Sequence, residues 1–167
     1  MQRDAIPYRL IVFDADETLR RTLVPGQPCP RASDEWELMP GVAERLRSVQ
    51  WGMSGPHLGV ASNQDQIAYG HLSETRARDL LFEMITAATD HVPPGDAVQL
   101  CRHALEQPCD CRKPQPGMLL RIMDHYGVSP AETLFVGNAL TDEEAARRAG
   151  TSFAFANDFF DWGGEQQ

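Results

Sequence analysis

The sequence lacks any apolar run close to the roughly 20 residues that span a bilayer, so we expect no membrane partner. Positive charge is also scarce. The chain has 15 lysines and arginines against 24 aspartates and glutamates, a net charge of −9. This balance argues against a nucleic-acid partner, which needs a basic surface. The sequence shows neither a repeat nor a signal peptide, so we expect a cytoplasmic location.

Cysteine is rare and unevenly placed. Of the four cysteines, Cys101, Cys109 and Cys111 fall within eleven residues, whereas Cys29 lies far from them. In a cytoplasmic chain, cysteines clustered this closely suggest a metal before a disulfide. Cys29 needs no special role.

The pattern of apolar residues alternates strands with helices along the 167 residues, which suffice for one domain, 1–167. We expect strands near 10–13, 58–61, 133–136 and 151–155, and helices near 42–50, 73–85, 97–105, 116–126 and 141–149. This alternation predicts an α/β fold. It would be a three-layer, Rossmann-like, doubly wound parallel sheet with helices on both faces. Single-domain size makes a monomer the expected state.

Two irregular segments are expected to line the entrance of a site. Residues 20–39 are rich in proline and too long for a simple turn, so they are predicted to fold over the site as a flap. Residues 87–113 would form a loop for substrate and zinc. No insertion is long enough for a separate cap domain, and residues 159–167 look like a loose end.

Polar side chains follow three predicted strands at the points where the strands end. Asp14 and Asp16 come directly after the apolar run 10–13, and two such carboxylates side by side need a compensating cation. Ser62 with Asn63 and Asn138 with Asp142 follow two other strands. In parallel sheets, ligands bind beyond the carboxyl ends of the strands. The coincidence predicts a ligand site with a bound metal at this edge.

The ordered set of motifs resembles the haloacid dehalogenase superfamily of phosphotransferases. The motifs are Asp14-Ala15-Asp16-Glu17-Thr18, Ser62-Asn63-Gln64, Lys113-Pro114, and Gly137-Asn138 with Asp142. The stretches 62–70 and 109–118 resemble the small capless phosphatases, subclass IIIA. These include heptose bisphosphate, histidinol and polynucleotide 3′-phosphatases, and Cys109-Asp110-Cys111-Arg112-Lys113 is most similar to the heptose bisphosphate branch.

The resemblance implies a role for each matched residue. Asp14 would attack phosphorus and form an aspartyl-phosphate, and Asp16 would protonate the leaving oxygen and then activate water. Ser62 and Lys113 would stabilise the phosphoryl group. The remaining roles are binding roles: Asn63 and Arg112 would contact substrate, and Asp14, Asp16, Asn138 and Asp142 would hold Mg²⁺.

Plain structural roles stay open for several of these residues. Ser62 could instead be a strand-end cap, and Asp142 could simply favour a helix N-terminus. Lys113 could be a solvated lysine, although Cys111, Arg112 and Pro114 frame it. Asn63 is as suited to shaping its loop as to touching substrate.

The sequence departs from the family pattern in two places. The fourth motif normally has aspartate after the glycine, whereas Asn138 stands here, so weaker metal binding is expected. The heptose phosphatase branch also carries Cys-x-His earlier in the chain, whereas here Cys101 and His103 lie close to Cys109 and Cys111. These four residues would suit a tetrahedral structural Zn²⁺ site, with His91 in reserve. A firm helix over 97–105 would prevent Cys101 and His103 from both reaching the metal.

The sequence therefore predicts a Mg²⁺-dependent phosphohydrolase that cleaves a small phosphorylated metabolite, a sugar phosphate, with a structural zinc. Two alternatives remain. One is a degenerate, non-catalytic binding module, which Asn138 motivates. The other is a 3′-phosphatase on nucleic-acid ends, which the acidic charge disfavours.

Overall fold

The structure, a computed structural model, describes residues 6–163. Its strands are β1 (Leu10–Phe13), β2 (Arg20–Thr22), β3 (Trp36–Leu38), β4 (His57–Asn63), β5 (Val98–Cys101), β6 (Thr133–Gly137) and β7 (Ser152–Phe155). Its helices are α1 (Val42–Leu46), α2 (Glu74–Thr89), α3 (Gly117–Tyr126), α4 (Leu140–Ala149) and α5 (Ala156–Phe159), with short 3₁₀ turns at Asp65–Ile67, Gly95–Ala97 and Pro130–Glu132. Within 6–163, no helix is both long and apolar enough to cross a membrane.

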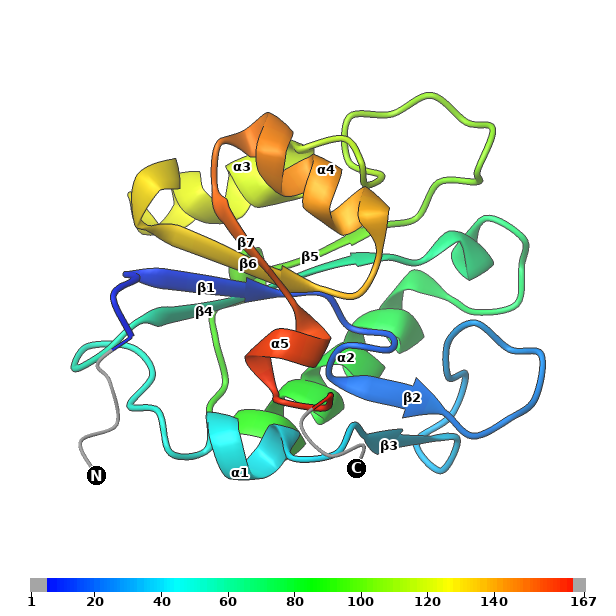
Figure 1. Cartoon of the computed structure of the whole chain (residues 1–167). Coiled ribbons are helices and arrows are strands. Elements are labelled where there is room, and N and C mark those ends of the chain that lie inside the picture. Colours follow the sequence, from blue (N-terminus) through cyan, green and yellow to red (C-terminus); the bar gives the residue numbers. More distant parts are fainter. Residues whose placement is uncertain (1–5, 164–167) are drawn as a thin grey trace.

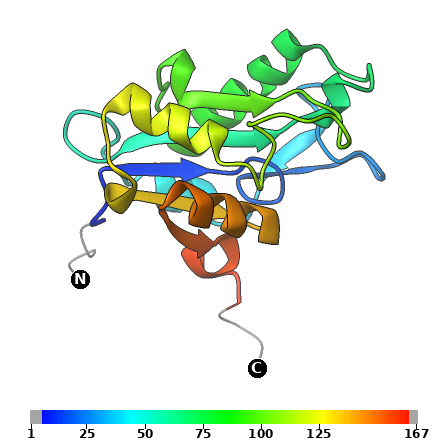
Figure 2. The same cartoon turned by 90° about the horizontal axis from the view of Figure 1, so that it is seen from above.

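Five parallel strands form one sheet in the order β5-β4-β1-β6-β7, with β1 at its centre. Helices α3 and α4 cover one face, and α1, α2 and α5 lie on the other (Figures 1 and 2). The three-layer Rossmann-like fold predicted from the sequence is confirmed. The three strands whose ends carry the predicted site residues, β4, β1 and β6, are direct neighbours.

The central strand β1 is buried on both faces, which explains its uninterrupted apolar run. Ile11 and Phe13 face the core shared with α1 and α2, whereas Leu10 and Val12 face the core shared with α3 and α4. Full burial of such a side chain contributes about 1.5–3 kcal/mol. This packing fixes the position of the chain that immediately follows β1.

The segment 20–39 contains an antiparallel hairpin, in which Arg20 pairs with Leu38 and Thr22 with Trp36. The hairpin lies beyond the carboxyl ends of the sheet strands (Figure 1). This position is compatible with a flap over the site. That the hairpin moves as a flap stays a prediction.

The helix expected over 97–105 is wrong. Residues 98–101 form strand β5, which pairs with the end of β4 and places Cys101 opposite Asn63. The local apolar pattern suits either element in so short a run, and pairing with β4 decides for the strand.

The loose end expected over 159–167 is also wrong within the described residues. Phe160 is buried and packs on Phe13 with ring centroids 6.3 Å apart, and the Trp162 indole N–H donates to the carbonyl of Pro40. Residues 164–167 lie outside the described part. Helix α1 ends earlier than expected, at Leu46, and α2 continues to Thr89.

Candidate active site and metal centre

The ends of β4, β1 and β6 bring three groups of predicted residues together. The backbone N–H of Asp14 donates to the carbonyl of Val136 in β6 at 2.9 Å, so Asp14 continues the sheet ladder. Ser62 and Asn63 are the last residues of β4, and Gly137 is the last residue of β6. The expected convergence at one edge of the sheet is confirmed.

Lys113 is the centre of the site. Its ammonium group donates to Asp14 Oδ1 at 2.7 Å, to Asp142 Oδ1 at 2.7 Å and to the carbonyl of Ala61 at 2.8 Å, which uses all three of its donors. Burial alone would lower the pKa of Lys113, but the two carboxylates outweigh it and raise the pKa above its ordinary value. Lys113 therefore stays charged in the interior, and it is not a solvated lysine.

Asp14 is almost fully enclosed. Its Oδ2 accepts the hydroxyl hydrogen of Thr18 at 3.1 Å, and its Oδ1 accepts from Lys113. Burial raises the pKa of Asp14 to about 6, and attraction to Lys113 opposes part of that shift. At neutral pH the carboxylate is ionised, as a nucleophile must be.

Asp16 has its own cation. Arg20 Nε donates to its Oδ1 at 2.8 Å, and Gln64 Nε2 donates to its Oδ2 at 3.0 Å and to Ser62 Oγ at 2.7 Å. The sequence predicted that a metal would compensate the two adjacent carboxylates. The structure shows two protein cations doing part of this work, Lys113 for Asp14 and Arg20 for Asp16.

Asp142 is held at the N-terminus of α4. Its Oδ2 accepts the backbone N–H groups of Asn138 and Ala139, both at 3.1 Å, while its Oδ1 binds Lys113. A Cβ at Gly137 would lie 2.6 Å from Asp142, so only glycine allows this close approach. Asp142 thus caps the N-terminus of α4 and also binds the ammonium group of Lys113. The neighbouring Asn138 is exposed.

Asn63 binds both backbone polar groups of Lys113, its N–H and its carbonyl. Its Oδ1 accepts the Lys113 N–H at 3.0 Å, and its Nδ2 donates to the Lys113 carbonyl at 3.2 Å. Both polar ends of the amide are therefore engaged in shaping the loop. Contact between Asn63 and a substrate stays a prediction.

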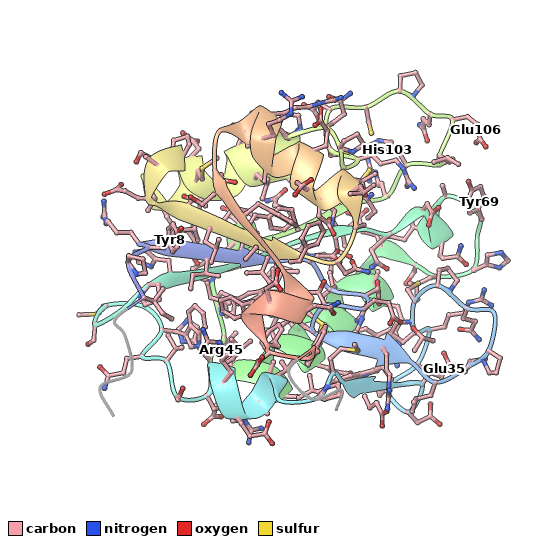
Figure 3. The ribbon with its side chains drawn as sticks, in the orientation of Figure 1. Tyr8, Glu35, Arg45, Tyr69, His103 and Glu106 are labelled. Atoms are coloured by element: carbon pink, nitrogen blue, oxygen red, sulfur yellow. The ribbon has the colours of Figure 1, made fainter. Side chains whose placement is uncertain are left out.

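A cavity of about 380 Å³ opens beside the lysine. Arg112 lies on its wall, with Nη1 3.8 Å from the Asp65 carboxylate and its side chain 21% exposed. Loop 102–116 contacts the segment that follows the 3₁₀ turn Asp65–Ile67 (Figure 3). The contact is a hydrogen bond, in which the Leu105 N–H donates to the Tyr69 hydroxyl at 3.3 Å. The cavity lining comprises Asn63, Leu105, Glu106, Gln107, Pro108, Cys109, Arg112, Lys113, Pro114, Gln115 and Thr141.

The four predicted zinc ligands converge. Cys101 at the end of β5 and His103, Cys109 and Cys111 in loop 102–116 place their ligand atoms within 4.8 Å of one another. Cys101 Sγ lies 3.4 Å from His103 Nδ1 and 3.1 Å from Cys111 Sγ. Three thiols and one imidazole at these separations fit a closed tetrahedral Zn²⁺ site. Because residues 98–101 form a strand, Cys101 and His103 reach the same point.

The cluster of Cys101, His103, Cys109 and Cys111 adjoins Lys113 in the chain. Cys111 lies two residues before Lys113, and the backbone N–H of Arg112 donates to Cys109 Sγ at 3.4 Å. Burial raises the pKa of Cys111 to about 12, so the thiol would lose its proton only on binding a metal. A metal here would fix the loop that carries Lys113.

Comparison with known proteins identifies the lineage. Haloacid dehalogenase-like hydrolases match residues 29–150. The chain belongs to this family. A D-glycero-beta-D-manno-heptose-1,7-bisphosphate 7-phosphatase of Pseudomonas aeruginosa is 37% identical over 148 residues, covering 83% of this chain and 75% of that protein. The protein of the same name from Pseudomonas putida is 31% identical over 142 residues, covering 85% and 78%.

A solved structure of a named phosphatase gives the same result. The D,D-heptose 1,7-bisphosphate phosphatase of B. bronchiseptica, complexed with magnesium and phosphate, matches with a TM-score of 0.75 and 26% identity, covering 95% of this chain and 89% of that one. The superfamily resemblance, the fold and the similarity to named phosphatases are thus confirmed. For this haloacid dehalogenase-like hydrolase, the individual roles of the site residues stay predictions.

Sequence reasoning missed Arg20 and Gln64. Arg20 belonged to a segment interpreted only as a flap, and Gln64 was quoted within a motif without a task. The only sequence signal for Arg20 and Gln64 was that both are polar residues close to the predicted acidic pair or to the end of a predicted strand. It was too weak to separate them from solvated side chains.

Proposed function

We propose that the protein is a Mg²⁺-dependent phosphohydrolase that cleaves a sugar phosphate monoester through an aspartyl-phosphate. The observation that carries the proposal is the buried ammonium of Lys113, which bridges Asp14 and Asp142 at the wall of the cavity. Such a cation neutralises both the nucleophile and the incoming phosphoryl group. The named relatives, two heptose bisphosphate phosphatases, support a sugar phosphate as substrate.

The reaction proceeds in two steps. In the first, an Asp14 carboxylate oxygen forms a bond to phosphorus, the ester P–O bond breaks, and Asp16 gives its proton to the leaving oxygen. In the second, water attacks the same phosphorus, Asp16 takes up the proton of that water, and phosphate leaves with Asp14 regenerated. Ser62 donates to a phosphoryl oxygen, the ammonium charge of Lys113 neutralises charge on the phosphoryl group, and Arg112 at the cavity wall binds a further substrate oxygen.

The site offers the donors that Mg²⁺ requires. Oxygen ligands are available from the Asp14 carboxylate, the Asp16 carbonyl and the exposed amide of Asn138. Once Asp16 has given up its proton, three carboxylates, those of Asp14, Asp16 and Asp142, face the two cations Arg20 and Lys113, which leaves a formal charge of −1 that suits a divalent ion. Bound Mg²⁺ would stabilise charge on the phosphoryl group. Because Asp142 is engaged with Lys113 and the α4 N-terminus, we assign direct ligation to Asn138.

Phosphate release tests the proposal. The wild-type protein is incubated with a panel of phosphorylated metabolites, including sugar phosphates, with Mg²⁺ and with excess chelator. The proposal expects release that depends on Mg²⁺ and favours sugar phosphates. Preference for a 3′-phosphorylated oligonucleotide would instead indicate the nucleic-acid alternative. Monomeric state and cytoplasmic location stay predictions from the sequence.

A non-catalytic binding module is the second candidate, because Asn138 supplies an uncharged amide where the family pattern has a carboxylate. This alternative expects phosphate binding without Mg²⁺-dependent turnover of any ester. Steady hydrolysis that is lost in the Asp16→Ala variant would refute it.

Restoring the carboxylate at position 138 is expected to strengthen metal binding. Asn138→Asp adds a charged oxygen ligand at an exposed position, so the Mg²⁺ concentration for half-maximal activity should fall by about tenfold. Asn157→Asp adds the same charge at an exposed position of α5 and serves as the control, with no expected change. An unchanged Mg²⁺ requirement in Asn138→Asp would show that residue 138 does not bind the metal.

A further inference from the structure

Arg20 is the largest fully buried side chain of the described structure, with 1% of its surface exposed. It begins strand β2 at the base of the hairpin, and its Nη1 has no hydrogen-bond partner among residues 6–163. Taking a guanidinium out of water is strongly unfavourable unless it is paired. A buried, incompletely paired arginine is therefore a costly choice for a position whose only task is packing.

The Arg20 guanidinium forms its side-chain hydrogen bonds with Asp16. Its Nε donates to Asp16 Oδ1 at 2.8 Å, and its Nη2 approaches Oδ2 at 3.5 Å. Gln64 is also buried. It directly follows strand β4 and donates to the same Oδ2 of Asp16. Both oxygens of Asp16 are thus held, while 19% of its side chain remains exposed. The carboxyl group cannot rotate without breaking these contacts.

One tight turn builds both the acidic pair and this support. The carbonyl of Ala15 accepts the N–H groups of Leu19 at 2.9 Å and Arg20 at 3.2 Å, and Glu17 N–H donates to the Arg20 carbonyl at 2.7 Å. Glu17 has a φ of 64°, a left-handed conformation that costs a non-glycine residue free energy. The turn thereby brings Arg20 back against Asp16, only four residues earlier in the chain.

We infer that Arg20 is a positioning residue, which holds Asp16 in the orientation needed to deliver its proton to the leaving oxygen of the substrate. The inference rests on the proposed function. Arg20 does not exchange the proton itself, because guanidinium stays protonated in proteins. A fork of two N–H groups fixes the plane of a carboxyl group, which a single ammonium cannot do.

The dependence on the leaving group distinguishes positioning from mere structural support. A sugar alkoxide needs a proton as it departs, whereas 4-nitrophenolate is stable without one. The ratio kcat/KM reports steps up to the first irreversible one, here formation of the aspartyl-phosphate, so the later role of Asp16 with water does not enter. We therefore compare kcat/KM for a sugar phosphate and for 4-nitrophenyl phosphate with Mg²⁺ present.

The Arg20→Met variant is expected to lower kcat/KM about 100-fold for the sugar phosphate and no more than about threefold for 4-nitrophenyl phosphate. Arg20→Lys keeps the charge without the fork and should restore part of the sugar phosphate activity. Arg21→Met is the matched control, since Arg21 is the next residue of the same hairpin but is half exposed and pairs with Glu37. Both of its kcat/KM values should match the wild type.

Equal losses for the two esters in the Arg20 variants would overturn the inference. If Arg20→Met fails to fold, the same comparison in Arg20→Lys decides, because any loss there must still fall mainly on the sugar phosphate. Gln64→Met removes the second support of Asp16 and should show the same bias. Failure of the proposed function is distinguishable, because the wild-type protein would then hydrolyse neither ester.

Discussion

Asp14→Asn is expected to lower Mg²⁺-dependent phosphate release by at least about 10⁴-fold, whichever ester is offered. The asparagine amide keeps the size and most contacts of the side chain but cannot form the bond to phosphorus. In the folded protein Asp14 lies against Lys113 and Thr18 with an ionised carboxylate at neutral pH. Removing the charge thus removes the nucleophile and leaves the surrounding framework in place.

The measurement is phosphate release by wild type and variant at equal concentration, together with circular dichroism to confirm that the variant is folded. Asp158→Asn makes the same chemical change at an exposed position of α5 and should leave the rate unchanged. Residual activity of Asp14→Asn within tenfold of wild type would rule out Asp14 as the attacking group.

Loss of the metal cluster is the second change with a large expected effect. Cys111→Ser removes one of the four converging ligands and should abolish stoichiometric zinc, because three remaining ligands leave the tetrahedral site open. The variant should also lose activity by about tenfold or more, because loop 102–116 carries Lys113 to Asp14. Elemental analysis of the purified protein and phosphate release provide the two readouts.

Cys29→Ala is the matched control for the cluster. Cys29 is buried beside Leu72, Ala77 and Leu80, away from the other three thiols, so its replacement should leave the zinc content unchanged. Wild-type protein that contains no zinc after growth with zinc, and that gains no thermal stability when zinc is added, would contradict a metal-binding role for the cluster.

The sequence was sufficient to predict the centre of the fold and the position of the site. The buried run 10–13 and the strand ends at Ser62 and Asn138 follow from a simple rule, that parallel strands end at one edge. Because Asp14, Asn63 and Lys113 come from segments anchored to those ends, their convergence was predictable. Their detailed contacts were not, and Asn63 turned out to hold the Lys113 backbone.

The parts that sequence reasoning missed depend on contacts between distant or tightly turned segments. Residues 98–101 form a strand only because the end of β4 offers an edge to pair with. Phe160 packs on Phe13, and Trp162 donates to the carbonyl of Pro40, so both are fixed by residues far away in the chain. Arg20 reaches Asp16 because Glu17 takes a left-handed conformation. Glutamate rarely adopts this conformation, so the sequence does not predict it.

Trapping the covalent intermediate tests the central claim most directly. Asp16→Asn removes the group that activates water, so the aspartyl-phosphate should accumulate when this variant is mixed with 4-nitrophenyl phosphate and Mg²⁺. After an acid quench, mass spectrometry of the digested protein should find one phosphoryl group on the peptide that contains Asp14. The Asp14→Asn/Asp16→Asn double variant should carry none. A phosphoryl group on another residue, or its absence from the Asp14 peptide while the single variant still releases 4-nitrophenol, would contradict the account.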